Sequence, residues 1–380
     1  MGIERTKGAT AAAPETAADA ETAARRVRAA GPEAAAPGAR AAGPDTEARP
    51  ERAARPAAGR RPAHSWRRAL LALLVIAAVV VPLSAAARPV IPAPAPAVLA
   101  APTRATLTTA YAANRADAAQ AARMAAAHGD AHRAAVDRQL ASRSSQLLGF
   151  DGRGPGRVTE VLGDLAHADR VAVLVPGSDT SLDTYGRFRA GALALYRELA
   201  RQAPRTAHPA VVAWLGYETP GTVSTTVLTT GRAERAAPEL RRLVHDLRAV
   251  VGAPGRPPRL ALVCHSYGSV VCGRAAAGLE VSDIALIGSP GTGAASVAEL
   301  HTPARVWAAR GADDWVANVP HVRAGLFGTT VGFGTDPVDP AFGARVFPAG
   351  KGGHSAYFTP GSPSLTNLAR IVLGTPKELR

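Results

Sequence analysis

Residues 260–273, LALVCHSYGSVVCG, decide the fold of this chain. The first five form an apolar run typical of a strand buried on both faces, and the residues after the serine are compatible with a helix. Between the two stands CHSYG at 264–268, in which Ser266 has a small residue two positions before it and two positions after it. A sharp turn from strand to helix requires small residues there, because the two elements nearly touch, and it holds the serine hydroxyl clear of the sheet. The stretch predicts a nucleophilic serine, with Cys264 standing where glycine is most common.

Short apolar runs alternate with amphipathic segments on both sides of this stretch. Strands are predicted at 170–175 (RVAVLV), 210–215 (AVVAWL), 260–264 (LALVC), 283–287 (DIALI) and 304–308 (ARVWA). Helices are predicted at 182–203, at 233–251, directly after Ser266 and at 364–373. This alternation predicts an α/β fold with a mostly parallel sheet flanked by helices, in which sites form at the carboxyl ends of the strands. Ser266 lies at one of those ends.

A nucleophilic serine needs a base and an acid, which follow the serine in the order acid then histidine when it sits on this kind of turn. The segment RGADDWV at 310–316 comes directly after a predicted strand, and GGHS at 352–355 forms a glycine-rich loop. We assign the base to His354 and the acid to Asp314, with its neighbour Asp313 as the alternative. The histidine would take the serine proton, and the aspartate would hold the imidazole tautomer and stabilise its charge.

Two backbone N–H groups are the candidate donors to a substrate oxyanion. In this fold one donor follows the nucleophile and the other comes from the loop after an earlier strand, which predicts Tyr267 and Ser178. Gly177, in VPGSD at 175–179, would let the backbone approach the substrate oxygen.

Cys264 and Cys272 are the only cysteines. One stands at the end of a predicted strand and the other about two turns into the following helix, so they form either a disulfide that stiffens the turn or a pair of small buried thiols.

No cofactor or metal is expected. The chain has no G-x-x-x-x-G-K-[ST] loop and no H-E-x-x-H motif, and GSPGTG at 288–293 lacks the full G-x-G-x-x-G spacing. We expect that loop to form a turn near the rim of the site, and His265 to pack beneath the serine without a chemical role.

The part of the chain before residue 146 divides by composition. Residues 1–68 contain almost only Ala, Gly, Pro, Arg and acidic residues, and such a segment is predicted to be disordered and cytoplasmic. Residues 69–87 are apolar and uncharged, 88–104 form a Pro/Ala linker expected to act as a semi-extended spacer, and 105–145 are Ala-rich. The Ala-rich segment predicts one long helix or two shorter ones with a break near 129–130.

The apolar segment 69–87 predicts a transmembrane anchor. Nineteen helical residues cover about 28 Å, close to the roughly 30 Å hydrocarbon core of a bilayer. Arginines 60, 61, 67 and 68 precede it, so the positive-inside rule places the N-terminus in the cytoplasm and residues after 88 outside the cell. The alternative is a cleaved signal, because small residues at 84–87 offer a cleavage site and lead to secretion.

The chain carries a formal net charge of +14, which raises the question of nucleic acid. Nearly all basic residues are arginines scattered along the chain, with lysine only at 7, 351 and 377 and without aromatic interleaving or zinc-ligand spacing. Nucleic acid is therefore not an expected partner.

With these residues in view, the chain from about 146 to its C-terminus resembles an α/β-hydrolase family of high-G+C bacteria with no assigned function. The resemblance is carried by residues 171–188, 212–220, 264–269, 288–293, 312–322 and 352–365. It implies an α/β-hydrolase domain over 146–380 and a catalytic triad at Ser266, an acid in the DDW segment and His354. It implies no particular substrate.

These features together predict an extracytoplasmic serine hydrolase, a carboxylesterase or lipase-like enzyme that forms an acyl-enzyme on small-molecule ester or lipid-like substrates. The alternatives are an acyltransferase with the same triad and a catalytically silent binding module. The oligomeric state and the acyl chain length are left open.

Overall fold

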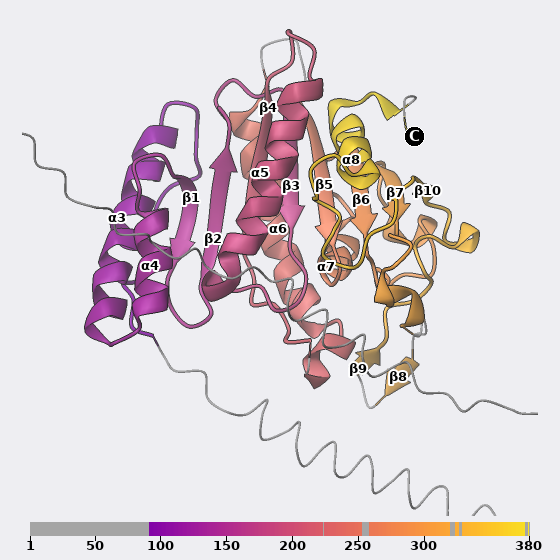
Figure 1. The fold of residues 1–380 in the computed structure, drawn as a ribbon, viewed down its shortest axis with the longest axis horizontal. Coiled ribbons are helices and arrows are strands. Elements are labelled where there is room, and N and C mark those ends of the chain that lie inside the picture. The colour runs from indigo at the N-terminus through magenta and orange to yellow at the C-terminus, as the bar shows by residue number, and fades with distance from the viewer. Residues whose placement is uncertain are drawn as a thin grey trace, which may run out of the picture. The chain divides into compact units, whose positions relative to one another are not determined.

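The computed structural model describes residues 91–222, 224–252, 258–319, 324–326, 329–376 and 379 (Figure 1). The predicted disordered tail at 1–68 and the predicted membrane segment at 69–87 lie outside the described residues. Within the described ranges no helix has the length and apolar character needed to cross a bilayer.

Eight strands of the described chain form one sheet in the order β1-β2-β4-β3-β5-β6-β7-β10. Strand β2 pairs antiparallel with β1 and β4, and the other pairs are parallel. The strands are β1 (Gln146–Asp151), β2 (Arg157–Leu162), β3 (Arg170–Val175), β4 (Pro209–Leu215), β5 (Arg259–His265), β6 (Asp283–Ile287), β7 (Arg305–Ala309) and β10 (Arg345–Val346). A separate antiparallel hairpin joins β8 (Ala324–Leu326) to β9 (Thr329–Val331).

The five predicted strands are the central ones, β3 to β7. Their apolar residues are buried along almost the whole of each strand, because helices cover both faces of the sheet. The edge strands were not predicted. Strand β2 contains Glu160, whose buried carboxylate accepts hydrogen bonds from Tyr185 and Arg189, so its sequence does not read as an apolar run.

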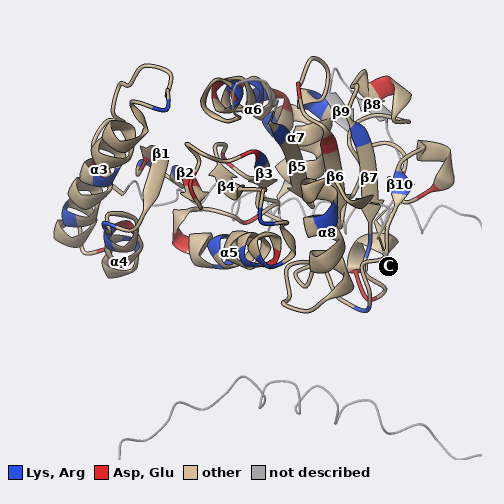
Figure 2. Cartoon of the chain, turned by 90° about the horizontal axis from the view of Figure 1, so that it is seen from above, with Lys and Arg blue, Asp and Glu red and all other residues tan. Residues whose placement is uncertain are grey.

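Two layers of helices enclose the sheet, as Figure 2 shows from above. Helices α5 (Tyr185–Gln202) and α8 (Pro363–Leu373) lie on one face, and α6 (Gly231–Val250) and α7 (Gly268–Ala275) lie on the other. Each layer packs its own apolar cluster against the sheet. Short 3₁₀ turns are η2 (Leu182–Thr184), η3 (Thr225–Leu228), η4 (Ala298–Leu300), η5 (Trp315–Asn318) and η6 (Pro340–Phe342).

The Ala-rich segment forms two helices, α3 (Leu107–Ala127) and α4 (Ala131–Leu140). They are separated by Gly129, which has a φ of +93°, and by Asp130, whose carboxylate caps α4 by accepting the N–H of Arg133. Both helices lie beside β1 at the edge of the sheet (Figure 1).

The described part of the Pro/Ala linker, 91–104, has neither helix nor strand. It is nevertheless in contact with the helices, because Ile91 is buried with Ala125 and Ala134, and the N–H of Ala97 donates to Asp117. The segment thus lacks helix and strand, as expected of a semi-extended spacer, and these contacts tie it to α3 and α4.

Candidate active site

Strand β5 turns directly into α7 at Ser266. The serine has a φ of +54°, in the left-handed region that residues with a side chain rarely adopt, and its N–H donates to the carbonyl of Ile287 at 3.0 Å. Backbone strain of this kind is found at functional sites, where the surrounding structure holds it in place. Gly268 is required two residues later, because a Cβ there would lie 2.6 Å from the carbonyl oxygens of Val175 and Pro176.

A disulfide joins the two arms of this turn. Cys264 in β5 and Cys272 in α7 are both fully buried, and their Cα atoms are 6.5 Å apart. Of the two arrangements left open by the sequence, the structure has the bonded one. The strand and the helix on either side of Ser266 are therefore covalently linked.

Three side chains predicted from the sequence meet at the carboxyl ends of the strands. The Nε2 of His354 lies 2.9 Å from the Oγ of Ser266, and its Nδ1 lies 3.0 Å from the Oδ1 of Asp314. A carboxylate only accepts hydrogen bonds, so the proton of a neutral imidazole is on Nδ1, and Nε2 is left to accept the serine hydroxyl. The Asp314 side chain is buried, whereas its neighbour Asp313 is exposed, so the acid in contact with the histidine is Asp314.

Asp314 is held by three donors. Besides His354, the N–H of Val316 donates to Oδ1 at 2.9 Å, and the hydroxyl of Tyr357 donates to Oδ2. Burial alone would raise the pKa of this carboxyl, but these hydrogen bonds outweigh burial and hold the pKa below its ordinary value. The group is therefore a carboxylate at neutral pH.

Tyr357 is a member of the site that the sequence analysis did not find. Its hydroxyl accepts the N–H of Gly311 at 3.0 Å while donating to Asp314, and its side chain is buried. Burial, reinforced by the hydrogen bond to Asp314, raises the pKa of Tyr357, so the hydroxyl keeps its proton. A tyrosine three residues after the histidine carries no sequence signal for this contact.

His265 also contacts the base, although the sequence analysis gave it no role. Its Nε2 lies 2.7 Å from the carbonyl oxygen of His354, and because a carbonyl only accepts, that nitrogen carries a hydrogen. Burial, together with the nearby His354, lowers the pKa of His265 to about 4. The ring is thus a neutral donor at pH 7 that fixes the backbone of the His354 loop.

The loop at 288–293 lies at the site, as expected from the sequence. Gly288 follows β6 with a φ of +54°, and a Cβ there would lie 2.9 Å from the Oδ2 of Asp314 and 3.2 Å from the Cε1 of His354. Glycine at this position leaves room for the acid and the base to meet. A glycine directly after a central strand was the signal available in the sequence.

The segment after β3 passes close to the serine. A Cβ on Gly177 would lie 2.6 Å from the Cβ of Ser266, so only glycine fits there. The hydroxyl of Tyr217 donates to the carbonyl of Pro176 at 2.7 Å, which anchors the segment before the glycine. The predicted oxyanion donors belong to the segments on either side of this contact, Ser178 directly after Gly177 and Tyr267 directly after Ser266.

Tyr267 uses its side chain to fix the start of α7. Its buried hydroxyl donates to the carbonyl of Thr229 at 2.8 Å and accepts the N–H of Ala233 at 3.3 Å. The residue after the nucleophile is therefore tied to the beginning of α6. In the described part of the chain, no group of three or more His, Cys, Asp or Glu side chains is arranged to hold a metal ion.

Residues 151–324 match a family model described as alpha/beta hydrolase. Over these residues the chain is similar to the α/β hydrolases. The matched region contains Ser266 and Asp314 but ends before His354.

Proteins similar to this chain include two uncharacterized proteins of Mycobacterium tuberculosis. One is 29% identical over 252 residues, a match that covers 58% of this chain and 37% of the relative. The other is 32% identical over 187 residues and covers 47% of this chain and 66% of the relative. The chain thus spans little more than a third of the length of the first of these proteins.

Solved structures with a similar arrangement include a serine hydrolase without a lid from Xanthomonas campestris and the esterase LipW from Mycobacterium marinum. The first has 20% identity and a TM-score of 0.37, and the match covers 62% of this chain and 95% of the other. The second has 13% identity and a TM-score of 0.36, and the match covers 68% of this chain and 90% of the other.

Proposed function

We propose that this α/β hydrolase is a serine hydrolase that cleaves carboxylic esters through an acyl-enzyme on Ser266. The observation that carries the proposal is the unbroken chain of hydrogen bonds from Ser266 to His354 to Asp314 at the sharp turn after β5. A serine hydroxyl becomes a strong nucleophile when an adjacent base removes its proton, and this base is itself oriented by a buried carboxylate.

The reaction has two halves that use the same groups. In the first, the Oγ of Ser266 attacks the ester carbonyl carbon while its proton passes to the Nε2 of His354, and the carbonyl oxygen becomes an oxyanion. The C–O bond to the alcohol then breaks, and His354 returns the proton to the departing oxygen. In the second half, water attacks the acyl-enzyme, again losing its proton to His354, and the acid product leaves as Ser266 regains its hydrogen.

Charge develops at two places during these steps. The imidazolium of His354 forms beside the carboxylate of Asp314, which stabilises it without taking the proton. The oxyanion forms beside Ser266, where the N–H groups of Tyr267 and Ser178 are the proposed donors. The close approach of Gly177 to the serine side chain supports this assignment, because the donor that follows Gly177 is carried toward the reacting carbon.

An ester is preferred over a peptide as the substrate class, because nothing in the sequence resembles a protease specificity element. An acyltransferase would form the same acyl-enzyme and pass the acyl group to another alcohol in place of water. A silent binding module would keep the fold without an activated serine. The acyltransferase would therefore differ from the hydrolase in its product, and the binding module would differ in the reactivity of its serine.

The proposed location is outside the cytoplasm, with residues 69–87 as an anchor or as a cleaved signal. The disulfide between Cys264 and Cys272 supports it, because disulfides persist in oxidising compartments. Sequencing the N-terminus of the mature protein distinguishes the two forms: an anchored chain keeps its residues before 69, and a secreted chain begins after about 87. Digestion with a protease added to intact cells tests the orientation.

Labelling with a fluorophosphonate tests the activated serine. The full-length protein, solubilised in detergent, is compared with Ser266→Ala, His354→Ala and a control, Ser355→Ala, which removes an exposed hydroxyl next to the base. Loss of a triad serine or histidine costs on the order of a millionfold in turnover, so labelling should vanish in the first two and persist in the control. A folded wild-type protein that takes up no label would favour the binding module instead.

A further inference from the structure

Trp315 is a large apolar side chain that the fold leaves in solvent. Its two neighbours are buried: Asp314 accepts hydrogen bonds from His354 and Tyr357, and Val316 packs inward, while Trp315 is 51% exposed. Among the described residues the other exposed large apolar side chains are Val98, Leu99 and Val346, none of which is in the loops around Ser266. Burial of a tryptophan side chain releases more free energy than burial of most other side chains. An exposed tryptophan beside the site is therefore a candidate for contact with a ligand.

The ring of Trp315 lies directly over the base. Its centroid is 4.7 Å from that of His354, and the two planes are tilted by 49°. The imidazole also has His265 as a neighbour, at 4.8 Å between the ring centroids, but that ring is partly buried and donates to the His354 carbonyl. The base therefore has one aromatic neighbour that belongs to the interior and one that is open to solvent.

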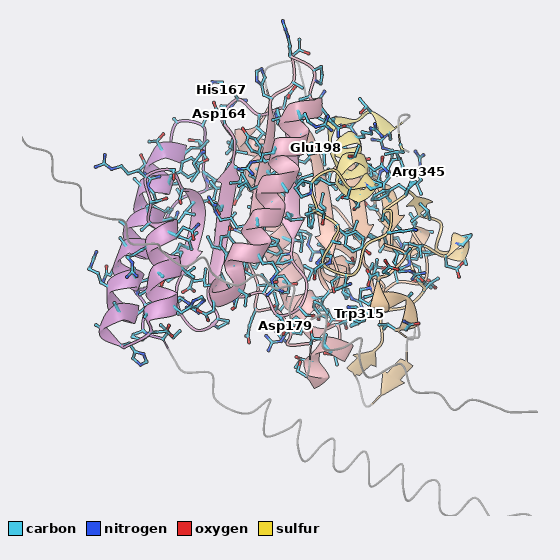
Figure 3. All side chains as sticks on the ribbon, viewed as in Figure 1. Asp164, His167, Asp179, Glu198, Trp315 and Arg345 are labelled. Atoms are coloured by element: carbon cyan, nitrogen blue, oxygen red, sulfur yellow. A yellow bond between two sulfur atoms is a disulfide. The ribbon has the colours of Figure 1, made fainter. Side chains whose placement is uncertain are left out.

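The position of Trp315 is fixed by the acid itself. Trp315 begins the turn η5, and the carboxylate of Asp314 caps that turn by accepting the N–H of Val316. In Figure 3 Trp315 lies at the same end of the sheet as Asp179, which follows Ser178 in the segment after β3, and opposite the end that carries Asp164 and His167. The indole is thus held at the end of the sheet where substrate must arrive.

The proposed chemistry then determines which part of an ester meets this ring. His354 must return its proton to the oxygen of the departing alcohol, so that oxygen lies within hydrogen-bonding reach of Nε2. The acyl carbon, in contrast, is bonded to Ser266 and directs its oxygen toward the backbone donors. The alcohol portion is therefore the part of the substrate on the histidine side, where the exposed indole stands.

From these contacts we infer that Trp315 is a specificity-determining residue that forms the subsite for the leaving alcohol and favours apolar or aromatic alcohols. The inference rests on the proposed function, because the leaving alcohol is placed beside Trp315 on the ground that His354 protonates its oxygen. A planar aromatic group placed against the indole buries apolar area and makes an aromatic contact. A methyl group is too small to bury a comparable area and makes no aromatic contact.

Three esters separate the alcohol side from the acyl side. Methyl acetate and benzyl acetate share an acyl group and have leaving alcohols of similar acidity, whereas methyl acetate and methyl phenylacetate share the alcohol. The wild-type protein should prefer benzyl acetate to methyl acetate in kcat/KM, and Trp315→Ala should lower that preference by about tenfold or more. Trp315→Phe should keep most of it, and Val346→Ala, which removes an exposed side chain on β10, should leave it unchanged.

The same contrast can be measured without turnover. The experiment uses two phosphonates that share the same phosphonyl group and inactivate an activated serine. One loses fluoride and the other loses p-nitrophenoxide. Only the second brings an aromatic group to the leaving side. Trp315→Ala should slow the p-nitrophenoxide compound selectively. The fluorophosphonate rate of the variant should match that of the wild-type protein, because the serine and the base are intact.

Three outcomes would overturn the inference. In the first, Trp315→Ala changes the preference for methyl phenylacetate and leaves that for benzyl acetate intact, which would place the indole on the acyl side. In the second, kcat/KM for all three esters falls by the same factor and the pH profile of kcat shifts, which would make Trp315 a positioning residue for His354. In the third, the variant leaves both leaving-group contrasts unchanged. A wild-type protein that neither reacts with the fluorophosphonate nor hydrolyses any ester would instead reject the proposed function.

Discussion

Asp313 and Asp314 are adjacent carboxylates with different environments, and this difference gives the clearest prediction at the scale of single residues. Asp314 contacts His354, whereas the side chain of Asp313 is exposed. Replacing Asp314 by Asn removes the charge that orients the imidazole tautomer and stabilises its cation, and should lower kcat by about 10⁴-fold. Asp313→Asn should change kcat less than about threefold, because solvent screens the charge of an exposed carboxylate.

Ester hydrolysis by the two variants, measured alongside their thermal unfolding, checks this prediction. Both proteins should unfold as cooperatively as the wild type. Equal activity losses in the two variants would show that the acid is not the residue in contact with His354.

His265 makes the stability of the fold depend on pH. A histidine in the unfolded chain has a pKa of about 6.5, whereas burial lowers the pKa of His265 in the folded protein to about 4. Between these values the unfolded state binds a proton that the folded state does not, so stability falls as the pH drops from about 6.5 toward 4. Through this group alone, the free energy of unfolding falls by roughly 2 kcal/mol between pH 7 and pH 5.

His265→Gln isolates this contribution, because glutamine retains an N–H donor for the His354 carbonyl and does not titrate. The variant should lose about 2 kcal/mol less stability than the wild-type protein between pH 7 and pH 5, as measured by urea unfolding at both values. Parallel losses in the two proteins would mean that His265 titrates normally in the folded state.

The sequence was sufficient to identify the three residues of the candidate triad and insufficient to identify the residues that hold them in place. Ser266, Asp314 and His354 each follow a strand end or stand in a glycine-rich loop, and their order along the chain is characteristic of the fold. Tyr357 and His265 act through contacts between loops that are far apart in sequence, and nothing in the residues beside them signals such a contact.

The disulfide carries a prediction at the scale of one turn between two elements. Cys264 and Cys272 are separated by eight positions, and closing a loop of that length in the unfolded chain stabilises the folded state by about 2–3 kcal/mol in the chain-entropy description. The double variant Cys264→Ala/Cys272→Ala should lose about that much stability in urea. Alanine is small enough for the turn, so the variant should still react with the fluorophosphonate.

Reductant provides the control for this measurement. It should lower the urea midpoint of the wild-type protein, whose disulfide becomes accessible on unfolding, and should leave the double variant unchanged. A double variant as stable as the oxidised wild type would mean that the bond adds no stability to the turn.

Among the elements, the central strands could be predicted because burial on both faces leaves a continuous apolar run. The edge strands could not: β1 has only partial burial along its length, β10 has two residues, and β2 places Glu160 in the interior beside Arg189. The predicted helix at 182–203 begins with the 3₁₀ turn η2, whose capping contacts involve Ser181 and Thr184. Edges and ends depend on polar partners supplied by other elements, and periodicity does not report those partners.

At the scale of the whole molecule, helices α3 and α4 are packed against the strands at one edge of the main sheet. The described residues all belong to one compact unit. Leu140 of α4 and two alanines of α3 share an apolar cluster with Leu147 and Phe150 of β1 and Val158 of β2. Asn114 in α3 donates to the carbonyl of Leu147, so polar contacts cross the predicted boundary at 146 as well.

Arg133 links these helices to the segment that leads away from the site. Its side chain is 1% exposed and pairs with both carboxylate oxygens of Asp183, at 2.7 and 2.8 Å, and it donates to the carbonyl of Gly152 at 3.1 Å. Asp183 stands in η2, directly after the segment that contains Gly177 and Ser178. The Asp183 side chain is 39% exposed, so the pair joins the interior to the surface and solvent would partly compensate the carboxylate if Arg133 were removed.

Two truncations test whether the helices belong to the folded unit. A protein that begins at residue 91 keeps all of these contacts and should unfold cooperatively and react with the fluorophosphonate. A protein that begins at residue 146 exposes the apolar cluster on β1 and loses the Arg133 contacts to Gly152 and Asp183, so it should unfold at lower urea concentration, bind apolar dyes and react at least tenfold more slowly. Equal stability and reactivity would place the boundary of the catalytic unit at 146. The expected difference would instead make α3 and α4 part of the structure that holds the oxyanion segment in place.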